Sequence, residues 1–214
     1  MDILGSGLEI LLHLDQHLVW LAQSYGTWIY AILFVIIFCE TGLVVTPFLP
    51  GDSLLFVAGT VAAAGDMNVH ALAAILSLAA VLGNLTNFHI GRFLGPRVFS
   101  RGKDSWFLRK DYLDRTNAFF VRHGGKTIVL SRFMPIIRTY APFVAGIGHM
   151  RYSQFLLFNL IGGLSWVGLL IYAGYFFGNI PWVKQNLTAV ILGIIIVSLL
   201  PGLIAYLRNR ASAA

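Results

Sequence analysis

The chain has 214 residues, of which 57% are hydrophobic and 11% are charged, and its mean hydropathy is +0.77. Soluble domains carry about 25% charged residues, so this composition excludes an ordinary soluble protein. It indicates one all-α integral membrane domain over residues 1–214. The net charge of +6 does not indicate binding to nucleic acid, because the basic residues gather in one loop between apolar segments, as in cytoplasmic loops of membrane proteins.

The first candidate helix, at residues 8–25, carries acidic and histidine side chains among leucines. These polar residues are Glu9, His13, Asp15 and His17. The pattern favours an amphipathic helix that lies at the membrane interface rather than one that spans the membrane.

An apolar segment at 27–65 is interrupted by Pro47, Pro50 and Gly51. A membrane-spanning helix needs about 20 apolar residues, and each half of this segment has only roughly a dozen. We therefore expect two half-helices that enter and leave the membrane on the same face, as a re-entrant hairpin. Non-helical backbone at this depth is tolerated only where it is buried in protein or lines a cavity.

An uninterrupted apolar stretch at 71–91 predicts a transmembrane helix, and a basic loop at 92–126 follows it. The loop holds nine of the fifteen basic residues of the chain. We expect it to lie in the cytoplasm and to contain a short helix on the surface of anionic lipid.

A second interrupted apolar segment, at 127–150, contains Pro135 and Pro142 and predicts a second re-entrant hairpin. Two further apolar stretches, 154–178 and 187–207, predict transmembrane helices.

The basic residues also predict the orientation of the chain. The loop at 92–126 and the C-terminal Arg208 and Arg210 both belong in the cytoplasm by the positive-inside rule. With three full spans between and after the hairpins, the two hairpins must enter from opposite faces of the membrane. This is the geometry of an inverted-topology repeat, whose substrate site lies near the midplane.

Four ionisable residues lie within the two interrupted segments: Glu40, Asp52, Arg132 and Arg138. Such residues are costly inside a membrane and indicate a functional site by default. Arginine suits bidentate binding of phosphate, so Arg132 and Arg138 are the predicted phosphate-binding residues. Glu40 and Asp52 are expected to neutralise them when no ligand is bound and to carry coupling protons. The sequence therefore predicts one shared polar pocket.

Structural explanations for the same residues stay open at this point. Glu40 and Arg132 would also suit a buried structural ion pair, and Asp52 could cap the second half-helix. Arg138 could extend its charge to the membrane interface.

Other candidate site residues give weaker signals. Three tryptophans fall near predicted segment ends, where interfacial belts are expected; they are Trp28, Trp166 and Trp182. The histidines lack the spacing of a metal site, and no metal or cofactor is expected.

Several motifs together make the chain recognisable. Residues 38–55 read FCETGLVVTPFLPGDSLL, residues 132–139 read RFMPIIRT, and residues 142–146 read PFVAG. Gly91-Arg92 and HGGK at 123–126 accompany them. In this combination the chain resembles the DedA family of bacterial inner-membrane proteins.

The resemblance implies two opposed re-entrant hairpins, a fold shared with eukaryotic lipid scramblases of the same superfamily, and a role in membrane-lipid homeostasis. Some members return undecaprenyl phosphate across the membrane, and others are proton-dependent transporters under alkaline stress or drug exposure. The essential acids and arginines of the family map onto Glu40, Asp52, Arg132 and Arg138. One departure is Asn84, where many relatives carry an acid.

We therefore expect an inner-membrane protein with a cytoplasmic C-terminus that translocates a lipid phosphate such as undecaprenyl phosphate, with or without proton coupling. The alternative is a proton-dependent exporter of small molecules or drugs. An enzyme is not expected, because phosphoryl transfer needs a nucleophile or metal and neither is visible. The expected partners are membrane phospholipids, the polyprenyl phosphate lipid and protons; a homodimer is left open.

Overall fold

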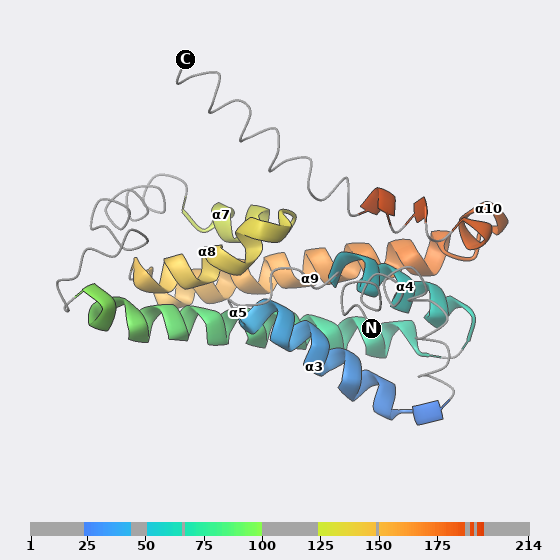
Figure 1. Cartoon of the computed structure of the whole chain (residues 1–214), viewed down its shortest axis with the longest axis horizontal. Helices are drawn as coiled ribbons and strands as arrows, with labels where there is room; N and C mark the ends of the chain where they lie inside the picture. Colours follow the sequence, from blue (N-terminus) through green and yellow to red (C-terminus); the bar gives the residue numbers. More distant parts are fainter. Residues whose placement is uncertain are drawn as a thin grey trace, which may run out of the picture. The chain divides into compact units, whose positions relative to one another are not determined.

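The computed structural model describes residues 24–43, 51–65, 67–99, 124–148, 150–186, 189–190 and 192–194. Every secondary-structure element in these ranges is a helix (Figure 1), so the all-α prediction is confirmed for this part of the chain. The expected helix at 8–25, most of the basic loop at 92–126 and most of the span at 187–207 lie outside the described residues. Pro47 and Pro50 lie outside them as well.

Two short apolar helices form the first interrupted segment. Helix α3 (Trp28–Gly42) has 15 residues and α4 (Gly51–Ala63) has 13. Both are shorter than the roughly 20 residues that cross a membrane, and their arrangement as a re-entrant hairpin stays a prediction. Every residue of α4 from Gly51 to Ala62 is buried, because a helix that is apolar on all sides finds its favourable place inside the protein.

Two long helices correspond to predicted spans. Helix α5 (Val69–Phe99) has 31 residues and α9 (Tyr152–Phe177) has 26. The stretches Val69–Leu94 and Tyr152–Phe177 are long and apolar enough to cross a membrane. Helix α5 also includes residues 92–99, which the sequence analysis placed in the basic loop. The difference arises because hydropathy marks where the apolar stretch ends, whereas backbone hydrogen bonds carry the helix further.

The second interrupted segment also consists of two helices. The short α7 (Lys126–Ser131) and the longer α8 (Pro135–Ile147) are separated by residues 132–134. Pro135 opens α8, a position where the missing N–H of proline costs nothing. Pro142 was expected to break the hairpin, but it lies inside α8. Proline is tolerated within membrane helices where neighbouring groups satisfy the freed backbone.

The five-residue helix α10 (Pro181–Gln185) follows α9. The chain divides into two compact units; three of the divisions fall within α3, α5 and α9, and the fourth falls between Pro47 and Phe48. Unit 1 comprises Met1–Ile36, Phe48–Ser77 and Trp166–Ala214, and unit 2 comprises Ile37–Pro47 and Leu78–Ser165.

In unit 1, α4 packs closely against the second half of α9. A side chain at Gly59 would collide with the backbone of Ile171, and one at Gly174 would collide with the backbone of Phe56. The Thr60 hydroxyl donates a hydrogen bond to the Gly174 carbonyl at 3.3 Å. Small residues therefore bring the two backbones together, which is the usual way that membrane helices associate.

In unit 2, α8 packs in the same manner against α5. A side chain at Gly91 would collide with the backbone of Phe143, and one at Gly146 would collide with the backbone of Phe88. Phe88 stacks on Phe155 of α9 with ring centroids 4.2 Å apart. These contacts form the apolar core that supports the polar residues described below.

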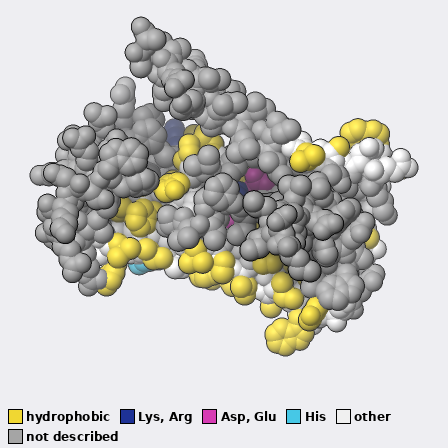
Figure 2. Space-filling view, viewed as in Figure 1, with side chains coloured by type: hydrophobic (Ala, Val, Ile, Leu, Met, Phe, Trp, Pro, Cys, Tyr) yellow, Lys and Arg dark blue, Asp and Glu magenta, His cyan; other side chains and the backbone are white. Residues whose placement is uncertain are grey.

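Much of the exposed surface of the long helices is apolar (Figure 2). The exposed side chains of α9 include Leu156, Leu157, Leu160, Ile161, Leu164, Leu169 and Phe176. Soluble monomers rarely expose a continuous apolar surface of this kind. The surface agrees with the composition and indicates that lipid, rather than water, surrounds these helices.

Candidate functional site

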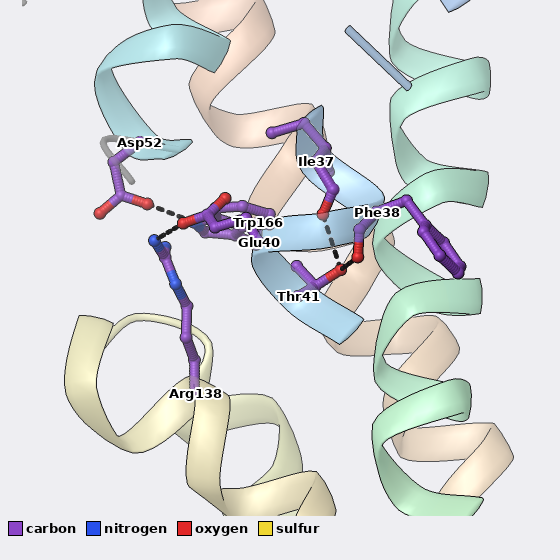
Figure 3. Close-up of polar contacts among 7 residues, drawn as sticks. All are labelled: Ile37, Phe38, Glu40, Thr41, Asp52, Arg138 and Trp166. Atoms are coloured by element: carbon purple, nitrogen blue, oxygen red, sulfur yellow. Dashed lines mark hydrogen bonds and ion pairs between the residues drawn. The ribbon is translucent and has the colours of Figure 1, made fainter. Parts of the chain in front are cut away.

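Glu40 and Arg138 form an ion pair in unit 2 between Oε1 of Glu40 and Nη2 of Arg138 (Figure 3). Glu40 lies in the last turn of α3, and Arg138 extends toward it from the first turn of α8. Their side chains are only 2% and 7% exposed. Arg138 is therefore buried against an acid rather than extended to the surface.

The positions of the two charges on their helices explain why each needs the other. The C-terminus of a helix carries a partial negative charge and disfavours a carboxylate, whereas the N-terminus disfavours a cation. Glu40 lies at the C-terminal end of α3, and Arg138 lies at the N-terminal end of α8. The ion pair offsets both unfavourable placements, which makes the interaction between α3 and α8 specific to these two residues.

Arg132 lies where α7 ends, and its side chain is held by neutral groups of two other helices. Its Nη2 donates to Oδ1 of Asn159 on α9 at 2.6 Å and to the carbonyl of Ala80 on α5 at 3.1 Å. Asn159 in turn donates from Nδ2 to the carbonyl of Val81 at 3.0 Å. Arg132 is 2% exposed and Asn159 is fully buried, so this polar network lies inside unit 2.

A second buried amide joins the same two half-helices as the ion pair. Nδ2 of Asn87 on α5 donates to the carbonyl of Thr139 at 2.7 Å and to that of Thr41 at 3.4 Å. Thr41 and Thr139 directly follow Glu40 and Arg138 in the chain. Asn87 thereby holds the backbone on both sides of the ion pair.

Asp52 belongs to unit 1, and its hydrogen-bond donor lies on α9. It is the second residue of α4, where the positive end of the helix favours a carboxylate. Its Oδ1 accepts a hydrogen bond of 2.9 Å from Nε1 of Trp166 on α9 (Figure 3). Trp166 is therefore not an interfacial residue as expected: it is buried, because its N–H has this partner inside the protein.

Three of the four predicted site residues are coupled within unit 2. Arg132 interacts electrostatically with both Arg138 and Glu40. The sequence also suited an ion pair between Glu40 and Arg132. In the structure, Glu40 forms its ion pair with Arg138. That Asp52 shares a pocket with these residues stays a prediction.

The arrangement can bind and exchange an anion. A guanidinium presents donors that match carboxylate and phosphate oxygens equally well. A phosphate could therefore take the place of the Glu40 carboxylate on Arg138. Within the described residues, no three His, Cys, Asp or Glu side chains are close enough together to hold a metal ion.

Two asparagines of the site were not predicted from the sequence. Asn87 and Asn159 are buried in apolar helices. Polar residues in such helices usually hydrogen-bond to neighbouring helices, so their presence within the predicted spans was a usable signal. The partner of each amide could not be read from the chain.

Comparisons with known proteins agree with the membrane assignment. Residues 49–176 match the VTT domain. The chain is 54% identical to "Protein DedA" of Escherichia coli K12 over 216 residues, which cover 100% of the chain and 98% of that protein.

More distant relatives carry less specific names. The chain is 42% identical to "Uncharacterized membrane protein Rv0364" of Mycobacterium tuberculosis over 193 residues, 88% of the chain and 84% of that protein. It is 38% identical to "Inner membrane protein YghB" of Escherichia coli K12 over 160 residues, 74% of the chain and 72% of that protein. No solved structure matches the chain.

Proposed function

The chain belongs to the DedA family of VTT-domain membrane proteins, and we propose that it translocates a lipid phosphate across the bacterial inner membrane. We propose undecaprenyl phosphate as the substrate. The name of one relative supports the membrane location, since YghB is called an "inner membrane protein". The names of these relatives do not specify a substrate, so the proposal depends on the chemistry of the site.

The observation that carries the proposal is the buried pair of Glu40 and Arg138. Removing one partner of a buried ion pair typically costs about 3–5 kcal/mol, because the other charge is left in a low dielectric. A phosphate headgroup that binds Arg138 supplies a replacement anion. The displaced Glu40 then avoids the same cost by taking up a proton, which links phosphate binding to proton movement.

The polyprenyl tail places a further demand on such a site. A headgroup can cross near the midplane only if the tail stays in lipid, so the site must open sideways or toward both faces. Two re-entrant hairpins that enter from opposite faces would provide this access, with Asp52 on the first hairpin as a second acceptor of protons. The two short helices in each interrupted segment support this proposal.

Purified protein in liposomes would test the function directly. We expect the protein to move a fluorescent polyprenyl phosphate between leaflets, and we expect Arg138→Ala to abolish this movement while the protein stays folded. Arg151→Ala is the matched control, since Arg151 is an exposed arginine just before α9. Equal transport by wild type and Arg138→Ala would refute the proposal. Transport of a small cation driven by a pH gradient, without lipid phosphate, would support an exporter instead.

A further inference from the structure

Asn159, Gly162 and Gly163 lie on one face of α9, because residues three and four positions apart are neighbours on a helix. All three are buried in unit 2. Arg132 approaches this face from the end of α7. The contacts that follow show how closely this helix face fits the arginine.

The two glycines leave the space that the Arg132 side chain occupies. A Cβ atom at Gly162 would lie 3.3 Å from Cδ and 3.4 Å from Nε of Arg132. A Cβ atom at Gly163 would lie 3.5 Å from Nη2 of Arg132 and 2.8 Å from Cγ2 of Val81. The Arg132 side chain therefore lies against the backbone of α9. A methyl group at Gly162 would press on Arg132 and on Cα of Val129, 3.2 Å away, whereas a methyl group at Gly163 would meet Arg132 at an ordinary contact distance and press on Val81.

Asn159 completes the fit because both ends of its amide are used. Its oxygen accepts from Arg132 at 2.6 Å, and its nitrogen donates to the Val81 carbonyl at 3.0 Å. Only one orientation of the amide satisfies both contacts. The hydrogen bond to Val81 therefore fixes the oxygen that holds Arg132.

The contrast with Arg138 concerns charge. Arg138 forms an ion pair with Glu40, which also attracts Arg132, but the hydrogen bonds of Arg132 to Asn159 and to the Ala80 carbonyl are to neutral groups. A neutral acceptor positions a guanidinium without cancelling its attraction for an anion. A carboxylate positions it and also competes with the anion.

We propose that Asn159, Gly162 and Gly163 form a neutral seat for the Arg132 guanidinium, and that Asn159 is a positioning residue for a phosphate-binding arginine. This inference depends on the proposed function. The two arginines then have different roles. Arg132 stays in place and binds the phosphate first, and Arg138 exchanges Glu40 for the same phosphate.

The decisive variant is Asn159→Asp, which keeps the shape of the side chain and adds a negative charge. The carboxylate still accepts from Arg132 but can no longer donate to the Val81 carbonyl, so a purely structural role predicts a lower unfolding midpoint with unchanged affinity of the folded protein. The proposed role predicts a lower affinity as well, since the new charge competes with the ligand. We expect Asn159→Asp to bind farnesyl phosphate at least about tenfold more weakly, as for the loss of one charge-assisted hydrogen bond.

Two matched controls separate this effect from general damage. Asn68→Asp makes the same chemical change at an exposed residue. Asn68 caps α5 by accepting hydrogen bonds from the backbone N–H groups of His70 and Ala71, and aspartate is equally suitable at such a position. Gly168→Ala adds a methyl group to α9 where nothing lies within 4 Å, whereas Gly162→Ala adds one against Arg132. We expect both controls to bind like the wild type and Gly162→Ala to bind more weakly.

Binding of farnesyl phosphate to purified protein in nanodiscs should be measured together with the midpoint of thermal unfolding. Competition by inorganic phosphate shows whether the headgroup alone is recognised. Equal affinity of wild type and Asn159→Asp would overturn the inference and leave the proposed function standing.

A second measurement tests the seat without any ligand. Asn159→Leu and Arg132→Leu should lower the unfolding midpoint less in combination than the sum of the two separate effects, because both remove one shared contact. If the wild type bound no farnesyl phosphate but the two effects were not additive, the proposed function would fail and the seat would stand. Additive effects would refute the seat itself.

Discussion

The ion pair between Glu40 and Arg138 gives the sharpest prediction about stability. Exposed ion pairs contribute only about 0–1 kcal/mol, but these two side chains are 2% and 7% exposed. The larger loss of stability that follows when a buried ion pair is broken therefore applies. We expect Glu40→Leu or Arg138→Met alone to lower the free energy of unfolding by about 3–5 kcal/mol.

The double variant is expected to behave differently from either single variant. With both charges replaced by apolar side chains of similar size, no charge is left buried without its partner, and such replacements are often close to neutral. The double variant should therefore be more stable than each single variant. Glu40 and Arg138 also make contacts beyond this pair, so part of the loss should remain.

Reversible unfolding in mixed micelles, followed by circular dichroism, would measure these differences. Arg151→Met serves as the control, because substitutions at an exposed arginine usually change stability by no more than about 0.5 kcal/mol. If the double variant lost as much stability as the two single variants added together, Glu40 and Arg138 would be energetically independent. The ion pair would then not offset the burial of the two charges or their unfavourable positions at the helix ends.

Two further predictions concern unit 1. Trp166→Phe removes the indole donor to Asp52 and should lower the free energy of unfolding by about 1–3 kcal/mol. The measurement uses the same micelles, and an unchanged stability would contradict a stabilising role of this hydrogen bond. Gly174→Leu places a side chain against the backbone of Phe56 and should reduce the yield of folded protein in a thermal-shift and gel-filtration assay. Gly168→Leu on the same helix is the control, and equal behaviour of the two variants would contradict the close packing of α4 on α9.

Several features of the fold could be predicted because they depend on local sequence. The low charge content and the apolar runs predict membrane helices, since burying backbone in lipid requires helical hydrogen bonding. The interruption around Pro135 was predicted from proline chemistry and agrees with the break at residues 132–134. Pro142 shows the limit of that rule, because the cost of a proline inside a helix depends on its neighbours.

The pairing of charges could not be predicted in the same way. The sequence indicated that Glu40 and the arginines belong to one site, but the choice of Arg138 as its partner depends on a contact between residues 98 positions apart. The role of Trp166 was misjudged for the same reason. Trp166 lies in the middle of α9 and is 1% exposed, and its hydrogen bond to Asp52 joins residues that are distant in the chain.

By itself, the sequence determined that this chain is an all-α membrane protein with two interrupted apolar segments, because hydropathy and proline act over a few residues at a time. The tertiary structure decided which acid meets which base, and it alone showed that Asn159 and two glycines receive Arg132. The physical reason is that charge and amide partners are selected by the distance between helices in space. That distance is set by packing at small residues such as Gly91 and Gly146.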